Sequence, residues 1–222
     1  LYGDDGDDVI SGGDGADRLY GYAGADELRG GDGADYIYAD ADDTVIDGGD
    51  GADRLYVVGT EGVSVDLAAA SIELAYGAAG NDTFDGANLT TNTSLYGKAG
   101  DDILTGGAGN DRLYGDDGDD VISGGDGADR LYGGAGKDTF IFGAADGQDR
   151  IYDFAGGDEL SFEGAEFSTD SLRFLQTGND TLISFDGIDG LSVRLSGVDA
   201  DDLASGLSTD EDAIIVSLDA VG

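Results

Sequence analysis

The sequence predicts an all-β fold, a stack of short strands joined by tight glycine-rich turns, with a small β cap at the C-terminal end. Three observations predict it. Residues 1–20 and 113–132 are identical, a nine-residue motif recurs through most of the chain between them, and one large apolar residue recurs once per motif. A unit this short cannot bury a core by itself, so the units are expected to stack on one another.

Each position of the motif has a distinct physical role. The motif carries glycine or a near equivalent at positions 1, 2 and 4, Asp at position 6 and an aliphatic residue at position 8. Units begin at residues 3, 12, 21, 30, 39, 48, 77, 97, 106, 115, 124 and 133, and only the unit at 39 lacks both the position-4 Gly and the position-6 Asp. Glycine adopts backbone angles closed to other residues, so positions 1–6 predict a tight turn. Positions 7–9 predict a three-residue strand whose middle residue points inward.

The residues expected to point inward form a thin core. They are Ile10, Leu19, Leu28, Ile37, Ile46, Leu55, Phe84, Leu104, Leu113, Ile122, Leu131 and Phe140. One apolar side chain per nine residues cannot offset the conformational entropy lost when glycine-rich turns become ordered. A further stabilising interaction is therefore required.

The charge indicates what that interaction is. The chain has 49 acidic and 10 basic residues, a net charge of -39, so a compact form repels itself unless cations are bound. Carboxylate and carbonyl oxygens are the available ligands, because the chain has no His and no Cys. Oxygen ligands favour calcium over zinc or copper, and magnesium prefers a stricter octahedron.

Composition also excludes several classes of function. The negative charge makes nucleic acid and anionic membrane surfaces poor partners, and no apolar run is long enough for a membrane span.

With 42 glycines and this charge, an acidic disordered segment is an alternative, but the phased repeats favour an ordered stack. The doubled acids Asp7-Asp8 and Asp119-Asp120 resemble a glycosidase pair only superficially, because they recur with the repeat. We therefore expect no enzyme activity in these residues.

The pattern G-G-x-G-x-D-x-U-x, where U is a large aliphatic residue, resembles the RTX (repeats-in-toxin) or haemolysin-type calcium-binding repeat. The resemblance covers residues 3–56 and 77–141. It implies a parallel β-roll, a right-handed β-helix with two nonapeptides per turn, in which calcium lies between successive loops on the same edge. Pairing each unit with the second unit after it gives about seven or more calcium sites.

The resemblance also assigns the metal-binding residues. The carboxylate ligands would be Asp8, Asp17, Asp26, Asp35, Asp53, Asp82, Asp102, Asp111, Asp120, Asp129 and Asp138. The carbonyl ligands would be Gly6, Gly15, Gly24, Gly33, Gly51, Gly80, Gly100, Gly109, Gly118, Gly127 and Gly136, with neighbouring turn positions. Residues 148–160 resemble the sequence that closes many RTX rolls, so Asp149 and Asp153 would complete a last site, with turn capping as the alternative role.

Four regions are expected along the chain. Residues 1–56 form a first RTX block, 57–76 form connecting turns without calcium, 77–141 form a second block, and 142–222 form the cap. Alternation of apolar and polar residues predicts cap strands at 172–176, 180–185 and 191–195, and residues 198–207 are expected to form a short helix. By resemblance, the tail at 212–216 carries an uncleaved signal for type I secretion.

The function expected from these features is that of a calcium-binding module of a secreted bacterial protein, folded by calcium after export by the type I secretion machinery. Two alternatives stay open. An upstream catalytic domain, N-terminal to Leu1, would make the chain part of an extracellular epimerase, lyase, lipase or protease. A ladder of Tyr20, Tyr38, Tyr56, Tyr114 and Tyr132 would bind an extracellular glycan, although cross-strand packing is favoured. A further set of residues has two possible roles. Binding of an anionic ligand is one, and neutralisation of the surrounding acidic charges is the favoured one. The set is Arg18, Arg54, Arg112 and Arg130.

Overall fold

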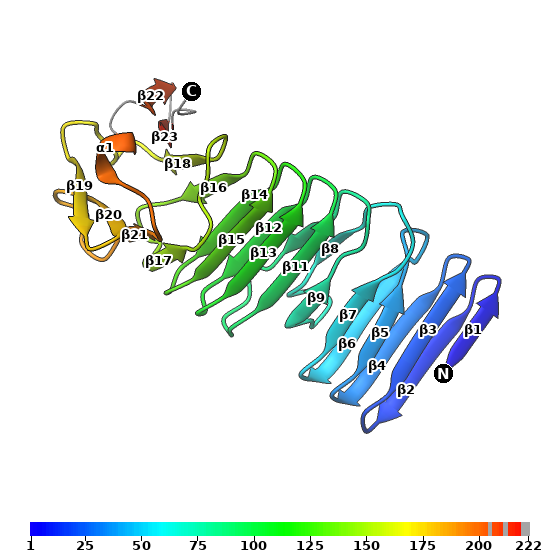
Figure 1. The fold of residues 1–222 in the computed structure, drawn as a ribbon. Helices are drawn as coiled ribbons and strands as arrows, with labels where there is room; N and C mark the ends of the chain where they lie inside the picture. The colour runs from blue at the N-terminus through cyan, green and yellow to red at the C-terminus, as the bar shows by residue number, and fades with distance from the viewer. Residues whose placement is uncertain (204–205, 211–212, 219–222) are drawn as a thin grey trace.

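The chain is an elongated solenoid of about nine turns (Figure 1). The computed structural model describes residues 1–203, 206–210 and 213–218. The chain runs alternately through two facing parallel sheets, and antiparallel strands follow at the C-terminal end. The predicted all-β parallel roll with a C-terminal β cap is therefore confirmed.

The first layer is one continuous sheet of twelve strands. In spatial order these are β1 (Tyr2–Asp5), β3 (Arg18–Ala23), β5 (Tyr36–Ala39), β7 (Arg54–Val57), β9 (Leu74–Tyr76), β11 (Ser94–Ala99), β13 (Arg112–Asp117), β15 (Arg130–Ala135), β17 (Gln148–Ile151), β21 (Ser192–Leu195), β20 (Asp180–Phe185) and β19 (Leu172–Thr177). All pairs from β1 to β21 are parallel, as a solenoid requires.

The second layer is divided into two sheets. The first part contains β2 (Val9–Asp14), β4 (Glu27–Gly33) and β6 (Val45–Gly51). The second part contains, in spatial order, β8 (Ser64–Asp66), β10 (Thr83–Asp85), β12 (Ile103–Gly107), β14 (Val121–Gly125), β16 (Thr139–Phe142), β18 (Glu159–Glu163), β23 (Ala213–Ser217) and β22 (Gly206–Asp210). The irregular residues between β7 and β8 thus interrupt one layer only.

The register shows how the nonapeptide builds the roll. Leu19 lies beside Ile37, and Leu113 lies beside Leu131, so neighbouring strands are 18 residues apart and two units make one turn. Where the sequence is irregular the step grows to 20 residues, as between Phe84 and Leu104, yet the apolar residues stay aligned.

Most strands are longer than the three residues expected from the motif, although β10 has that length. β4 and β6 each have seven residues and continue through the glycine positions, with Gly31 beside Gly49. The strands extend through the glycines because successive turns have the same shape. Since each turn lies on another turn of the same shape, its amides pair along the stack, as Gly6 N does with the carbonyl of Ala23.

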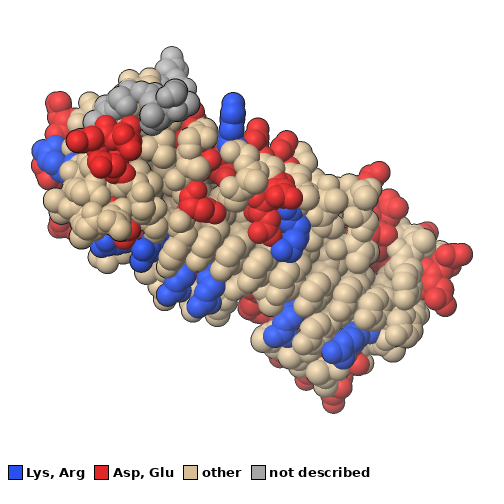
Figure 2. Space-filling model, viewed as in Figure 1, with Lys and Arg blue, Asp and Glu red and all other residues tan. Residues whose placement is uncertain are grey.

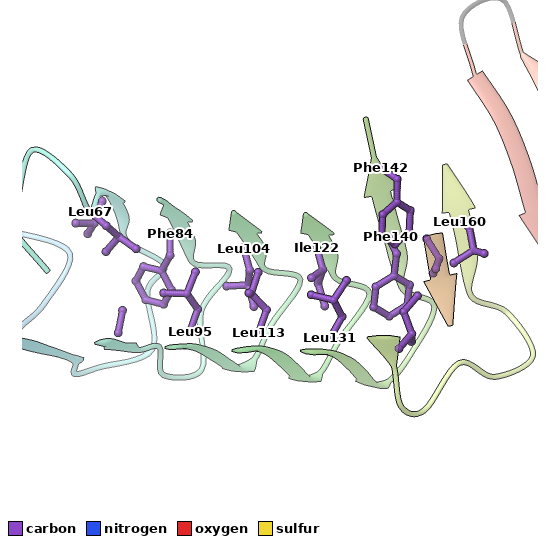
Figure 3. Packing of buried hydrophobic residues seen from close by; sticks show 14 of the residues in the cluster. Leu67, Phe84, Leu95, Leu104, Leu113, Ile122, Leu131, Phe140, Phe142 and Leu160 are labelled. Carbon is purple, nitrogen blue, oxygen red and sulfur yellow. The ribbon is translucent and has the colours of Figure 1, made fainter. Parts of the chain in front are cut away.

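The core consists of two facing rows of side chains, one from each layer (Figure 3). Eleven of the twelve residues expected to point inward are buried. The exception is Ile46, which is partly exposed because β6 has no neighbouring strand on its far side. Ile46, Val65 and Ala69 instead line a cleft of about 320 Å³ at the break between β6 and β8.

The C-terminal residues cover the open end of both layers. β21 pairs with β17 of the first layer, and β23 pairs with β18 of the second, so the last parallel strand of each layer is covered and the sheets end in the cap strands β19 and β22. The three predicted cap strands are present as β19, β20 and β21.

The helix predicted over 198–207 is wrong in extent. The structure has only α1 (Ala200–Leu203), because β22 pairs with β23 from Gly206 onward. Part of the tail at 212–216 forms β23, while residue 212 lies outside the described residues. Within the described part of the chain, no helix combines the length and apolar character that crossing a membrane requires.

Candidate metal centre

Two rows of buried aspartates run along the two edges of the roll. In each row, one carboxylate oxygen accepts a hydrogen bond from the amide of the equivalent residue one turn earlier. Asp35 Oδ1 accepts from Asp17 N at 2.7 Å, and Asp120 Oδ1 accepts from Asp102 N at 2.8 Å. The seven pairs of units that the sequence places one turn apart are all joined in this way.

The second carboxylate oxygen of these aspartates is buried and has no donor. Among the described residues, ten Oδ2 atoms lack any hydrogen-bond partner: those of Asp17, Asp26, Asp35, Asp53, Asp102, Asp111, Asp120, Asp129, Asp138 and Asp149. A buried carboxylate oxygen without a partner costs free energy. Ten such oxygens, distributed over the two rows, are therefore the arrangement expected around bound cations.

The position-1 glycines let Asp oxygens approach the backbone closely. A Cβ atom on Gly12 would lie 2.7 Å from Asp17 Oδ2 and 2.5 Å from the carbonyl oxygen of Gly30. Every position-1 glycine has an Asp Oδ2 atom at 3.0 Å or less from its missing Cβ, namely Gly3, Gly12, Gly21, Gly30, Gly48, Gly77, Gly97, Gly106, Gly115, Gly124 and Gly133. A side chain at position 1 would therefore displace the carboxylate, which is a ligand type that calcium prefers.

These position-1 glycines were absent from the site residues expected from the sequence. The available signal was that every regular unit starts with glycine, whereas the irregular unit starts with Ala39. Sequence reasoning assigned this glycine to the turn, and only the geometry shows that it faces the carboxylate.

The position-4 glycines, expected to supply carbonyl ligands, lie above one another at the loop tips. Gly33 has a φ of +139°, and a Cβ on it would collide with the carbonyl oxygen of Gly15 one turn earlier. The same contact relates Gly24 to Gly6, Gly51 to Gly33, Gly100 to Gly80, Gly118 to Gly100, Gly127 to Gly109 and Gly136 to Gly118. Their carbonyls therefore point along the stack toward the next loop.

The two candidate residues of the closing segment lie in different places. Asp149 Oδ1 accepts from Asp129 N at 2.9 Å and its Oδ2 has no partner, so Asp149 continues the aspartate row. Asp153 Oδ1 accepts from Gly133 N at 3.1 Å, at the turn of the last regular unit.

Three further acidic residues extend the rows and were missed by the repeat pattern. Asp43 Oδ1 accepts from Asp26 N at 3.1 Å, Glu73 Oε2 accepts from Asp53 N at 2.9 Å, and Asp158 Oδ1 accepts from Asp138 N at 3.1 Å. Asp43 directly precedes position 6 of the irregular unit, and Asp158 follows a Gly-Gly pair, so both had a local signal. Glu73 had none, because its segment lacks the motif.

The donor set is distributed rather than clustered. No group of three or more acidic side chains converges on one point within the described residues. A cation between two loops would therefore combine one or two carboxylates with backbone carbonyls. Calcium accepts such mixed oxygen sets, with six to eight ligands in flexible geometry.

Burial opposes ionisation of the rows when no cation is bound. Burial, followed by the charges of Asp120 and Asp82, raises the pKa of Asp102 to about 7, against a partial lowering by the backbone hydrogen bond within the row. Burial likewise raises the pKa of Asp138 to about 7 and of Asp120 to about 6. A bound cation reverses this preference, because it favours the ionised carboxylate.

Acidification without calcium is therefore expected to increase the β-structure of the chain. When folding raises the pKa of a carboxyl group, there is a pH range in which the group is protonated in the folded state and ionised in the unfolded state. Stability is then greatest below the ordinary Asp pKa near 4 and falls as the pH rises through about 6 to 7. Circular dichroism in chelator from about pH 8 to about pH 5 measures this change. A decrease in β-signal on acidification would contradict it, and with calcium present the dependence should reverse because protons compete for the ligands.

A model of the RTX calcium-binding nonapeptide repeat, in four copies, matches residues 2–37, 20–55, 73–88, 90–122 and 114–149, which together cover more than half of the chain. The chain belongs to the RTX calcium-binding repeat family. RTX repeats imply calcium binding, which agrees with the oxygen-only donor set described above.

One solved structure similar to this RTX chain is that of the extracellular lipase LipA from Serratia marcescens. The two sequences are 25% identical, the match covers 90% of the RTX chain and 37% of the lipase chain, and the TM-score is 0.31. The RTX chain thus spans little more than a third of the lipase's length. No curated protein sequence matches it.

Proposed function

We propose that the chain is a calcium-dependent folding module of a secreted bacterial protein. The observation that carries this proposal is the set of ten buried Asp Oδ2 atoms without donors, nine of which lie close against a position-1 glycine. Without cations these oxygens destabilise the roll, and with calcium they join successive turns. Calcium binding and folding are then one event.

The proposed ligands are the position-6 aspartates and the backbone carbonyls of the adjacent turns. About seven or more ions would bind, in residues 1–56 and 77–141. Two features support sites beyond the regular units. Asp149 repeats the geometry of the rows, and Glu73 occupies the place of an aspartate beside Asp53. Both residues therefore join the proposed set, with Asp153 as a member at the closing turn.

The proposed mechanism separates export from folding. In the cytosol, where calcium is scarce, the acidic chain stays unfolded and passes through a type I secretion machinery. Outside, calcium near the affinity range of extracellular modules, about 10⁻⁴–10⁻³ M, fills the sites. The cap is expected to fold before the roll, because Phe162, Phe167 and Phe185 form a packed aromatic cluster that needs no metal.

Hydrogen exchange during a calcium titration tests the proposal. Amides of residues 1–141 are expected to become protected only as calcium is added, while amides of β18, β20 and β21 are protected earlier. Far-ultraviolet circular dichroism should show β-structure at millimolar calcium and little in chelator. Magnesium at the same concentration is the control and should substitute poorly. At neutral pH, a β-rich chain in chelator or a disordered chain at millimolar calcium contradicts the proposal.

A second candidate function concerns the protein as a whole. The similar Serratia chain is an extracellular lipase, and this chain covers only 37% of it. We infer that the module stabilises an upstream passenger, for which a lipase, protease, or polysaccharide epimerase or lyase is a candidate. Hydrolytic activity in the 222 residues alone would show instead that the active site lies within the module.

A further inference from the structure

The two outer faces of the roll differ chemically although both are built from the same nonapeptide. The first sheet carries nine stacked tyrosines in register: Tyr2, Tyr20, Tyr38, Tyr56, Tyr76, Tyr96, Tyr114, Tyr132 and Tyr152. The equivalent positions of the second layer are Ser11, Arg29, Asp47, Asp66, Asp85, Thr105, Ser123 and Ile141. Stacking of turns alone would not require this difference, so the tyrosine face is a candidate interaction surface.

The tyrosine rings cover one another's faces. Neighbouring ring centroids are 4.2–5.1 Å apart and the interplanar angles are 2–17°. The half-exposed rings therefore present their edges and hydroxyl groups to solvent, and a ligand cannot insert against their faces. This surface offers hydrogen bonds in a regular row rather than a stacking platform.

Four arginines form a column beside the ladder. Arg112, Arg130, Arg150 and Arg194 occupy the same register position on β13, β15, β17 and β21, so they lie one strand spacing apart, about 4.8 Å. Like charges side by side on a sheet are destabilising. We call these four residues the arginine column.

The fold leaves the arginine column largely unneutralised. Asp180 is shared by Arg150 at 3.2 Å and Arg194 at 3.7 Å, whereas no ion pair forms at Arg112 or Arg130 within the described residues. A chain with 49 acidic and 10 basic residues has abundant carboxylates for pairing. Four adjacent guanidinium groups with one acidic partner indicate that an anion from outside the chain binds there.

The shape of this surface supports the same inference. Arg130, Arg150, Arg194 and Tyr152 line a hollow of about 270 Å³ at the C-terminal end of the column, together with Asp129 and Asp149 of the aspartate rows. Figure 2 shows basic side chains following one another along the lower part of the viewed face, beside a broad uncharged surface. The site is therefore long and narrow, and it ends in a pocket.

We propose that the arginine column and the adjacent tyrosine hydroxyls bind a linear acidic polysaccharide of the uronic-acid class. The planar guanidinium group matches a carboxylate with two parallel hydrogen bonds. The sugar hydroxyls bond with the hydroxyl row of Tyr114, Tyr132 and Tyr152. This binding is separate from the folding role and depends on calcium only because the roll must be folded.

Two physical arguments favour this occupant over other polyanions. Single-stranded nucleic acid binds through bases stacked on open aromatic faces, and here those faces are covered. The two carboxylates that line the hollow, Asp129 and Asp149, belong to the proposed calcium ligands, so bound calcium offsets their repulsion of a polyanion. A polymer bound along the column thus interacts mainly with the guanidinium groups.

The test measures affinity for short oligogalacturonates, with the full chain folded in calcium. The double variant Arg112→Gln/Arg130→Gln is expected to bind about tenfold more weakly or worse, since each change removes a charge-assisted contact. Neither residue has an ion pair to lose, so the calcium titration monitored by circular dichroism should be unchanged. The triple variant Tyr114→Phe/Tyr132→Phe/Tyr152→Phe keeps the ring stack and is expected to weaken binding several-fold.

Arg29→Gln is the matched control, because it removes the same charge from the opposite layer. Arg130→Lys retains the charge without the guanidinium fork and is expected to bind with intermediate affinity. Wild-type affinity in the double variant would overturn the proposal, as would an equal loss in Arg29→Gln. Equal binding of carboxyl-reduced oligosaccharides, or tighter binding of oligothymidylate, would also overturn it. A failure of calcium-induced folding would show up separately, in the circular dichroism of the unmodified chain.

Discussion

Replacing Asp120 by alanine is expected to destabilise the calcium-bound roll by about 3 kcal/mol or more. Asp120 is fully buried in the aspartate row that also contains Asp102 and Asp138. Its Oδ1 accepts from Asp102 N at 2.8 Å, and its Oδ2 has no protein partner. The substitution leaves a buried amide unpaired and removes a proposed calcium ligand, so two losses add. Urea denaturation at saturating calcium measures the difference in free energy of unfolding.

Two further variants separate these contributions. Asp120→Asn keeps an oxygen acceptor for Asp102 N but loses the charge, so its defect should lie mainly in the calcium midpoint. Asp117→Asn removes the same charge from an exposed position of the same unit and is expected to change stability little. If Asp120→Ala were as stable as Asp117→Asn, the aspartate row would not be the source of cohesion between turns.

Replacing Gly12 by alanine is expected to eliminate one calcium ion from the first block. The new methyl group would lie 2.5 Å from the carbonyl oxygen of Gly30 and 2.7 Å from Asp17 Oδ2, so it would displace both of these proposed ligand oxygens. Gly12 does not have a positive φ, so backbone strain does not contribute. When the calcium concentration is a hundredfold above the dissociation constant, losing one site lowers the free energy of unfolding by about 2.7 kcal/mol. Calcium per chain, measured by equilibrium dialysis, should fall by one.

Gly15→Ala in the same unit provides the comparison. Gly15 has a φ of +114°, and no atom lies within 4 Å of a Cβ built on it. This variant therefore carries backbone strain of about 1–2 kcal/mol, and its methyl group displaces no proposed ligand. It should bind the same number of ions as the unmodified chain, with lower stability. Equal ion counts in both variants would mean that the position-1 glycines serve only the turn.

The repeat predicted the core well because the period of the sequence matches the period of the structure. Eighteen residues complete one turn, so every position-8 residue returns to the same place in the cross-section. Ile46 departs from the pattern for a non-local reason. Its exposure depends on the interruption between β6 and β8, which no residue near Ile46 encodes.

The candidate site was only partly predictable for a related reason. The aspartates and the position-4 glycines belong to the motif and can be recognised in one unit. Glu73 lies outside any unit, and its relation to Asp53 arises only when a 20-residue turn brings the two together. The role of Gly12 was hidden because a missing side chain has a meaning only relative to the atoms around it.

The amino-acid sequence alone predicted a stack of short strands with oxygen ligands that favour calcium, because both follow from local chemistry repeated in phase, and the resemblance to RTX repeats added the parallel roll. The tertiary structure decided which residues meet across turns. The nine-ring ladder passes through Tyr76 and Tyr96 of the irregular region, and the arginine column continues to Arg194 of the cap. Neither alignment follows from the nonapeptide, since turns of unequal length keep register only through the hydrogen bonds between strands.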